Sequence, residues 1–357
     1  MMERNSKQNP KQNPKQKGNL HRPKNRKMCK KNKKNKWRLA VLFIIYEIIF
    51  SIIIAPFVLF YGPFQNAKSR FVGTAMGSMH FNFLATTFLS QDEINKILGK
   101  TDQSDDQNSD DSLVNVPTKS DNTIKYEVLE GNKSFIGHVL TVSNPRRIHI
   151  GYTSKLNDAN KAGETTSQIA LNNGAEAAVN GGAFTDESNS SLWSANGGTP
   201  SGVIIRDGKT VYDDTAGAKS GTIAMANGKL LIGKYTTKQL LQAGATEAVG
   251  YKTTLLVSGG SMTPMSGDGG DGSSPRTLIG QKKDGSILLV VLDARIESMR
   301  DAATLKEAQE VMYKLQCVTA GTLDGGKSAT MFFKDDVVNN PSYAYGERSI
   351  PTAIIVK

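Results

Sequence analysis

Residues 304–326, TLKEAQEVMYKLQCVTAGTLDGG, contain a helix signal, a strand signal and a glycine pair in that order. Thr304 and Glu307 have the spacing of a capping box, in which each side chain bonds to the other residue's backbone N–H, so a helix is predicted to begin at Thr304. We expect this helix to extend to Gln316. Its apolar residues recur at helical spacing and would form one buried stripe of Leu305, Ala308, Met312 and Leu315.

The same order of polar-capped helix, short Ala/Val strand and glycine pair recurs twice earlier in the chain. It is found in TTSQIALNNGAEAAVNGG at 165–182 and in TTKQLLQAGATEAVG…LLVSGG at 236–260. Helices that alternate with strands predict a mixed α/β (α+β) domain, which we place at 124–357 with one twisted mixed sheet. Three glycine pairs after strands predict loops gathered at one ligand-binding edge, although ordinary tight turns would give the same pattern.

The rest of this region consists of short apolar runs separated by glycine, which predict further strands. These runs are 125–129, 138–142, 147–152, 202–206, 222–226, 255–257, 287–293, 330–333 and 353–356. The region is long enough for one large hydrophobic core or two small ones.

The segment before this domain, 61–123, reads as a stalk and an acidic linker. Residues 71–89 are moderately apolar but contain His80 and Asn82, so we expect an interfacial or stalk helix rather than a second membrane span. Residues 101–123 are acidic and polar without periodicity. We expect them to form a disordered tether that holds the domain off the membrane surface.

An apolar stretch of 22 residues, 39–60, is long enough to cross a bilayer as one helix. Its only charge is Glu47, which we interpret either as a contact to a partner helix or as a tolerated neutral carboxyl. A cleaved signal peptide is the alternative, but its apolar run is usually shorter. Because the basic residues precede the stretch, we expect a single-pass cell-membrane protein with residues 1–38 cytoplasmic and the C-terminal domain extracellular.

The charge of the chain is concentrated in its first 38 residues. The whole chain has 44 Lys and Arg against 33 Asp and Glu, and residues 1–38 hold 15 of the basic residues with one acid. This Lys/Asn/Gln/Pro tail is typical of a disordered segment near anionic lipid. The remainder is nearly neutral, which argues against nucleic acid as a partner. Cys29 and Cys317 would lie on opposite sides of the membrane, which excludes a disulfide within one chain.

The octapeptide GTLDGGKS at 321–328 fits the phosphate-loop pattern of nucleotide hydrolases, but its context does not. Such a loop must open a helix whose N-terminus holds phosphate. Here the strand-like SATMFF follows. We therefore do not expect nucleotide hydrolysis.

The polar residues of the glycine-rich motifs are carboxylates, arginines and asparagine. Arginine and exposed amides suit phosphate, and carboxylates suit acid–base chemistry at a sugar, so together they fit an anionic sugar. Each residue also has an ordinary structural explanation, such as a turn cap or a surface ion pair. No His/Cys/Asp spacing indicates a metal site. Asp268 and Asp271 could bind Ca²⁺ but lack EF-hand spacing, so we assign no certain cofactor.

Six motifs in order make residues 124–357 resemble the phosphodiester glycosidase family, whose bacterial members are often described as exopolysaccharide-biosynthesis proteins. The motifs are VNGGAF (179–184), TPSGVIIRDGK (199–209), SPRTLIGQKKDG (274–285), VLDAR (291–295), GTLDGGKSATM (321–331) and GERSIPTAIIVK (346–357). The sequence departs from the family pattern at Ala183, Ala294, Lys327 and Ala329. These departures leave the core pattern intact but put the identity of the sugar in question.

The resemblance implies an extracellular hydrolase of sugar-1-phosphodiesters, for example of N-acetylglucosamine, in cell-surface glycan or exopolysaccharide. We assign Asp324 or Glu347 as the base or charge stabiliser, with Asp293 in support. The expected substrate-binding residues are Asn180, Gly181, Gly182, Arg276, Thr277, Arg295, Gly325, Gly326, Lys327 and Ser328. Among these, Arg276 and Arg295 would hold phosphate.

Two alternatives to a hydrolase stay open at this point. The first is a non-catalytic module that binds an anionic glycan or acts as a scaffold among polysaccharide-assembly proteins. Carboxylates at Asp293, Asp324 and Glu347 would repel such a ligand, which favours an enzyme. The second alternative is a glycan transferase that uses the same bond cleavage.

Overall fold

The computed structural model describes residues 31–76, 81–98, 107–118, 121–156, 162–185, 197–295, 302–342 and 345–357. By its contacts the chain divides into two compact units, residues 1–58 and 59–357. Helix α1 (Lys31–Tyr61) contains the apolar stretch, and its residues 36–61 are long and apolar enough to cross a membrane. The expected disorder of the basic tail concerns mostly residues 1–30, which lie outside the described residues.

Three short helices open the second unit: α2 (Gln65–Met76), α3 (Phe83–Thr86) and α4 (Gln91–Ile97). Helix α4 begins at a capping box formed by Ser90 and Glu93. The three helices bury a small core of their own, made of Phe60, Val72, Ala75, Ala85, Leu89, Ile94 and Leu98. We call residues 59–76 and 81–98 the helical cap.

The remainder of the second unit contains three sheets. The first has the order β1 (Ile124–Leu129), β2 (Phe135–Val142), β13 (Ile287–Ala294), β12 (Arg276–Lys282), β14 (Cys317–Thr322), β10 (Leu255–Ser258) and β11 (Ser261–Met262). The second has the order β16 (Asp336–Val337), β15 (Met331–Phe333), β4 (Ala177–Asn180), β17 (Thr352–Val356) and β3 (Ile148–Tyr152). The third has the order β6 (Lys209–Asp213), β5 (Val203–Arg206), β9 (Ala245–Gly250), β7 (Ser220–Ala226) and β8 (Lys229–Tyr235).

The mixed helix-and-strand class is confirmed, but three sheets replace the single mixed sheet that we expected. Neighbouring strands in all three pair antiparallel within the described residues. The physical reason lies in the connections. Pairs such as β5–β6, β7–β8 and β12–β13 are joined by hairpin turns, and a tight turn can join only antiparallel strands.

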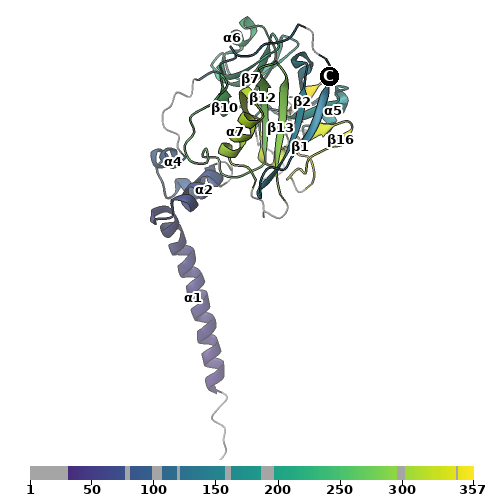
Figure 1. Ribbon diagram of the computed structural model, residues 1–357. Helices are drawn as coiled ribbons and strands as arrows, with labels where there is room; N and C mark the ends of the chain where they lie inside the picture. The colour runs from purple at the N-terminus through teal and green to yellow at the C-terminus, as the bar shows by residue number, and fades with distance from the viewer. Residues whose placement is uncertain are drawn as a thin grey trace, which may run out of the picture. The chain divides into compact units, whose positions relative to one another are not determined.

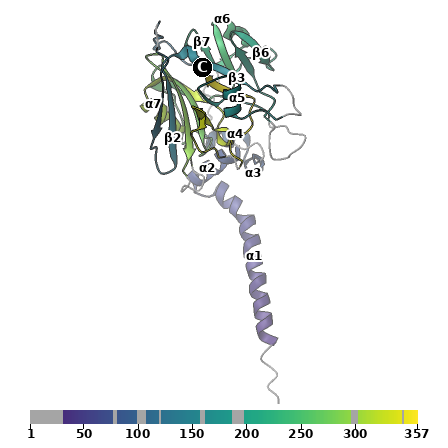
Figure 2. The ribbon, with the colours of Figure 1, turned by 90° about the vertical axis from the view of Figure 1, so that its right-hand side faces the viewer.

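A central apolar core lies where the three sheets face one another. It contains Leu140 and Leu289 of the first sheet, Val179 and Ile354 of the second, and Ile223 of the third. Each sheet buries its other face under one helix: α7 (Leu305–Lys314) on the first, α5 (Thr166–Asn172) on the second and α6 (Thr237–Gln242) on the third. Figure 1 shows α7 over β10 and β12, and Figure 2 shows α5 beside β3.

The recurring helix–strand pattern is confirmed in all three copies. Helices α5, α6 and α7 each begin at a capping box, whose threonines are Thr165, Thr236 and Thr304. Each helix is followed, directly after its C-cap residue, by a residue with positive φ: Gly174, Gly244 and Gln316. The strands that follow, β4, β9 and β14, belong to three different sheets. The pattern therefore builds one helix-covered sheet per copy.

The disordered tether that we expected before the domain is wrong for residues 107–118, which we call the strap. The Ser109 amide donates to the Ile232 carbonyl at 2.7 Å, and the Ser109 Oγ accepts from the Ile232 amide at 2.9 Å. Further along, Gly259 donates to the Asp110 carbonyl at 3.2 Å. The strap is thus bound along the outer edge of β8 and the turn after β10. Hydrophobic periodicity did not predict this binding, because the hydrogen bonds that hold the strap are made by its backbone and small polar side chains.

Candidate functional site

The strand ends of two of the copies meet at one buried amide, that of Asn180 at the end of β4. Its Nδ2 donates to the Asp324 carbonyl after β14 at 2.6 Å. Its Oδ1 accepts from the Thr277 hydroxyl in β12 at 2.7 Å and from the Thr330 amide at 3.1 Å. Asn180 is fully buried, so its amide is occupied in holding the first and second sheets together. Asn180 and Thr277 therefore position the site instead of contacting substrate directly.

The glycines after β4 bring the second sheet against the end of β9. Gly181 donates to the Thr352 carbonyl at 2.9 Å, and Gly182 donates to the Thr352 hydroxyl at 3.0 Å. A Cβ on Gly182 would lie only 2.2 Å from the Gly250 carbonyl oxygen, which explains the requirement for glycine. The amides expected to hold substrate oxygens are therefore already bonded at Gly181 and Gly182.

Asp324 lies near the Tyr251 phenol, close enough for its charge to act on that group. The Asp324 amide donates to the Gly181 carbonyl at 3.3 Å. Burial raises the pKa of the Tyr251 phenol, and the nearby carboxylates of Asp324 and Asp271 raise it further. Tyr251 directly follows β9, and Asp271 belongs to the glycine-rich loop 267–274. The site thus contains a half-exposed carboxylate whose charge acts on a phenol that stays neutral.

Arg276 is nearly buried at the start of β12 and holds the glycine-rich loop in place. Its Nη2 donates to the carbonyls of Gly272 at 2.7 Å and Asp271 at 3.3 Å, and its Nε donates to the Ala303 carbonyl at 3.1 Å. Burial lowers the pKa of the Arg276 guanidinium, and the Asp271 carboxylate opposes this effect. The remaining nitrogen, Nη1, makes no hydrogen bond within the described residues. It is therefore the part of Arg276 suited to an anion.

The turn after Asp324 is not followed by the helix that a nucleotide-binding loop requires. Residues 326–328 form a single 3-10 turn, and strand β15 follows instead of a helix. Gly326 donates to the Pro275 carbonyl at 2.8 Å, and a Cβ on Gly325 would lie 2.7 Å from the same oxygen. Lys327 is exposed. The buried Ser328 Oγ has no hydrogen-bond partner within the described residues.

Asp293 ends β13 at the same edge of the first sheet, two strands from β14, but its surroundings differ. Its side chain is 2% exposed and accepts from the Asn339 Nδ2 at 3.0 Å and the Asn340 amide at 2.5 Å. Burial raises its pKa to about 6, although these bonds lower it. His138 Nε2 lies 3.8 Å away, and burial lowers the pKa of that imidazole.

Two other residues expected at the site make their described contacts elsewhere. Arg295 donates through Nε to the Asn132 carbonyl at 2.7 Å and forms an ion pair with Glu130 at 3.2 Å, so it holds the β1–β2 turn. Glu347 accepts from the amide of Ser167 at 3.0 Å and from its hydroxyl, so it caps the start of α5. The described contacts therefore do not bring Asp293, Asp324 and Glu347 together.

Sequence reasoning missed Tyr251 and the pair Phe184–Arg348. The guanidinium of Arg348 lies 4.8 Å from the centroid of the Phe184 ring, which follows the Gly181–Gly182 turn. A signal for Tyr251 was present in the recurring pattern. The Ala/Val strands of the other two copies end at or near a polar site residue, Asn180 or Asp324, whereas we assigned the second copy's role to the glycine pair 259–260. That pair contacts the strap instead.

One group among the described residues has the composition of a metal site. The ligand atoms of His149, Asp207 and Glu247 lie within 4.8 Å of one another. Glu247 is buried and accepts from the Ile150 amide at 2.7 Å, while its other oxygen lies 3.1 Å from His149 Nδ1. An imidazole with carboxylates suits a transition metal better than Ca²⁺. The hydrogen bonds already present join β3 to β9, which gives the group a structural role.

A model of the phosphodiester glycosidase family matches residues 173–357, about half of the chain and the part that contains all three converging strand ends. No protein with a curated description matches the chain.

Among solved structures, the catalytic domain of zebrafish N-acetylglucosamine-1-phosphodiester alpha-N-acetylglucosaminidase, auto-inhibited by its pro-peptide, is similar with a TM-score of 0.52 and 19% identity. The match covers 70% of this chain and 87% of the zebrafish chain. A Burkholderia pseudomallei protein matches with a TM-score of 0.47 and 17% identity, over 62% of this chain and 74% of its own. At this identity the zebrafish structure supports the fold only.

Proposed function

Because the chain belongs to the phosphodiester glycosidase family, we propose that it is a membrane-anchored extracellular hydrolase of sugar-1-phosphodiesters, with Asp324 at its catalytic centre. The observation that carries the proposal is the convergence of β4, β9 and β14 on Asp324 inside the family-matched region. The zebrafish enzyme's name suggests N-acetylglucosamine as the first sugar to test, in cell-surface glycan or exopolysaccharide.

The chemistry would break the bond between the anomeric carbon and the phosphate oxygen. Water adds its oxygen to that carbon, one of its protons passes to the Asp324 carboxylate, and the phosphate leaves as a monoester. Phosphate is a good leaving group, so the protein needs mainly to position water and stabilise positive charge on the sugar ring. A carboxylate beside the neutral Tyr251 phenol provides both functions.

We assign the phosphate to three donors for which the described residues supply no hydrogen-bond partner. They are Nη1 of Arg276, the exposed Lys327 ammonium and the buried Ser328 hydroxyl, and they come from the two segments that Gly326 and Pro275 join. These groups suit the three oxygens of a phosphate. In this assignment Asp293 and Glu347 support the site without contacting the substrate, since Asp293 holds Asn339 and Glu347 caps α5.

The orientation in the membrane rests on charge. Residues 1–38 hold 15 Lys and Arg before the one candidate span, and basic residues stay on the cytoplasmic side. The β-rich unit after the span would therefore face the outside, where cell-surface glycan is available.

The test is sugar release from the methyl phosphodiester of N-acetylglucosamine by the full-length protein in detergent micelles. We expect free sugar and methyl phosphate, and a loss of at least ~10²-fold in Asp324→Asn. Asp336→Asn, which changes an exposed aspartate on β16, is the matched control and should retain full activity.

Three results would contradict or redirect the proposal. Full turnover by a folded Asp324→Asn protein would remove Asp324 from the chemistry. Tight retention of the probe without cleavage, across N-acetylglucosamine, glucose and galactose, would favour a glycan-binding module. Appearance of the sugar on an added glycan acceptor, in place of free sugar, would identify a transferase.

A further inference from the structure

The helical cap begins where the candidate membrane span ends, with no spacer between them. Phe60 is buried in the core of the cap, where its ring stacks on Phe88 at a centroid distance of 5.0 Å. The hydroxyl of Tyr61, the last residue of the span, donates to the Phe88 carbonyl at 2.7 Å. The cap therefore has to lie at the surface of whichever membrane the span crosses.

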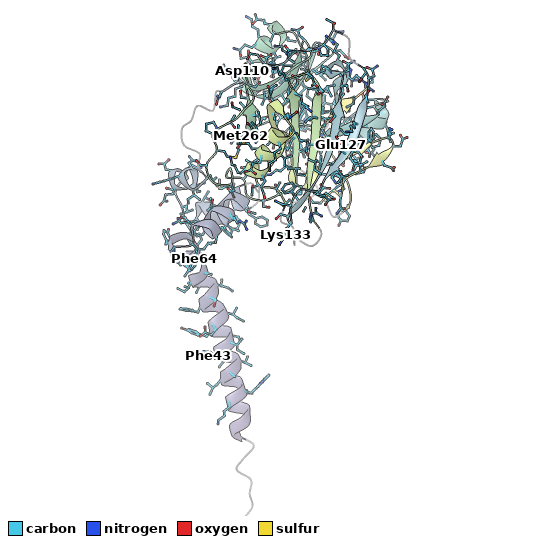
Figure 3. The ribbon with its side chains drawn as sticks, viewed as in Figure 1. Phe43, Phe64, Asp110, Glu127, Lys133 and Met262 are labelled. Carbon is cyan, nitrogen blue, oxygen red and sulfur yellow. The ribbon has the colours of Figure 1, made fainter. Side chains whose placement is uncertain are left out.

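The cap also exposes aromatic side chains that a water-facing surface would not favour. The exposed fractions are 63% for Tyr61, 54% for Phe64, 48% for Phe81 and 54% for Phe83. Figure 3 shows the Phe64 side chain at the margin of the cap. Phe64 is three residues beyond the span, which places it within about 10 Å of the span's end. Large exposed apolar groups so close to a span are suited to the membrane interface.

The same cap packs directly against the loop that shapes the candidate site. A Cβ on Gly73 of α2 would lie 2.8 Å from the Gly272 nitrogen, and a Cβ on Gly270 would lie 2.6 Å from the Leu98 carbonyl oxygen. Only glycine permits approaches this close. Gly272 in turn accepts from Arg276 Nη2 at 2.7 Å, so one residue separates the cap from the guanidinium assigned to phosphate.

This contact rules out the arrangement that the sequence suggested, in which a long tether holds the domain off the membrane. The cap is held against the site loop, and the strap is bound to the third sheet. The site loop therefore stays next to a surface that the bilayer covers. A soluble polymer would have no need of such a position, whereas a substrate embedded in the membrane would.

We propose that the substrate is a glycosyl phosphodiester whose aglycone is a lipid of the same membrane leaflet. This inference rests on the proposed function and names its substrate class. Water adds to the anomeric carbon, one proton passes to Asp324, and the carbon–oxygen bond to phosphate breaks. The products are free sugar, released to the outside, and a lipid monophosphate that stays in the bilayer.

The experiment compares three presentations of one bond by full-length protein in vesicles of phosphatidylcholine and phosphatidylglycerol. The N-acetylglucosaminyl phosphodiester of a long-chain alcohol is placed in the same vesicles or in separate vesicles, and the methyl phosphodiester is dissolved in the buffer. Confinement to one membrane raises effective concentration, so we expect turnover in the same vesicles to exceed the other two by about 10-fold or more.

Variants of the cap separate membrane docking from catalysis. Phe64→Ser combined with Phe83→Ser should remove most of the advantage of the lipid substrate and leave turnover of the methyl substrate unchanged. Leu241→Ser is the matched control, because Leu241 on α6 is a similarly exposed apolar residue outside the cap. Equal losses on both substrates, or no loss on either, would overturn the inference.

The outcomes also distinguish this inference from the proposed function. Cleavage of the methyl and lipid substrates at equal rates overturns the lipid assignment and leaves the hydrolase intact. Cleavage of neither contradicts both. A separate readout tests the membrane contact without turnover: fluorescence of Phe83→Trp should be quenched by brominated lipids, beyond the background of the two native tryptophans. Absence of added quenching would show that the cap does not enter the interface.

Discussion

Asp293 and Asp324 follow neighbouring parts of one sheet yet have opposite surroundings. Strands β13 and β14 both pair with β12, so the two aspartates lie along one edge. Asp293 is enclosed by Asn339, Asn340 and His138, whereas Asp324 is half exposed beside Tyr251. The difference shows that residues distant in the chain decide what an aspartate after an apolar strand can do.

The largest expected effect comes from removing the support of Asp324. Asn180→Ala removes the partner of the buried Thr277 hydroxyl, of the buried Thr330 amide and of the partly buried Asp324 carbonyl. We expect the free energy of unfolding to fall by about 2–4 kcal/mol, because buried polar groups would lose hydrogen bonds. Urea unfolding followed by circular dichroism measures this. One ordinary hydrogen bond contributes roughly 1 kcal/mol to stability. A smaller loss than this would show that water replaces the Asn180 amide.

Asp293 should control the pH dependence of stability instead of the reaction. Its pKa is about 6 in the folded protein and 3.8 ordinarily, so the folded protein binds more protons between these values. Stability from this group is fully present below pH 3.8 and is lost as the pH rises through about 6. The total change is about 3 kcal/mol.

Urea unfolding at several pH values in wild type and Asp293→Asn measures this contribution. His138 acts in the opposite direction, because burial lowers its pKa from 6.5, and the difference between the two proteins isolates the carboxyl. Parallel pH profiles for the two proteins would contradict the raised pKa of Asp293.

Tyr251→Phe tests whether the surroundings of Asp324 contribute to the reaction. The substitution removes only the hydroxyl beside the carboxylate and keeps the ring that fills the space after β9. We expect kcat/KM for the methyl phosphodiester to fall by about 10-fold, the value of one hydrogen bond to substrate or water. Tyr212→Phe, which changes a tyrosine on β6, is the control. An unchanged kcat/KM would place the Tyr251 hydroxyl outside the site.

Gln316→Gly has the smallest expected effect and changes β14 at the end opposite Asp324. Gln316 has a φ of 64°, a conformation that costs a side-chain-bearing residue about 1 kcal/mol, and the two related helices end in glycine there. We expect the melting temperature to rise while kcat stays unchanged. A fall in stability would mean that the Gln316 side chain makes contacts worth more than the strain.

Local signals in the sequence predicted the local elements well. The capping box at Thr304 marked the start of α7, and the apolar runs marked β2, β13 and β17 within a few residues. These features depend on neighbours in the chain, so propensity and periodicity carry them. The arrangement into three sheets was not predicted, because the partner of each strand depends on hairpins and on packing across the core.

The candidate site was predicted in part for the same reason. Asp324, Arg276 and Asn180 were selected by their motifs, and the structure brings them together. The motifs also selected Glu347 and Arg295, whose contacts are with Ser167 and with the β1–β2 turn. Residue type indicates which chemistry is available, but contacts across more than 100 residues decide which group is free to perform it.

The strap has a consequence for where the folded domain begins. Strand β8 is the outer strand of its sheet, and an unpaired edge is a template for pairing with another chain. Ser109 covers the Ile232 edge groups, and Asn108 Oδ1 accepts from the Lys234 amide at 2.8 Å. A protein truncated at Ile124, where the composition changes, would uncover this edge and become prone to aggregation. Residues of the segment that the sequence indicated as a spacer therefore protect the solubility of the folded unit.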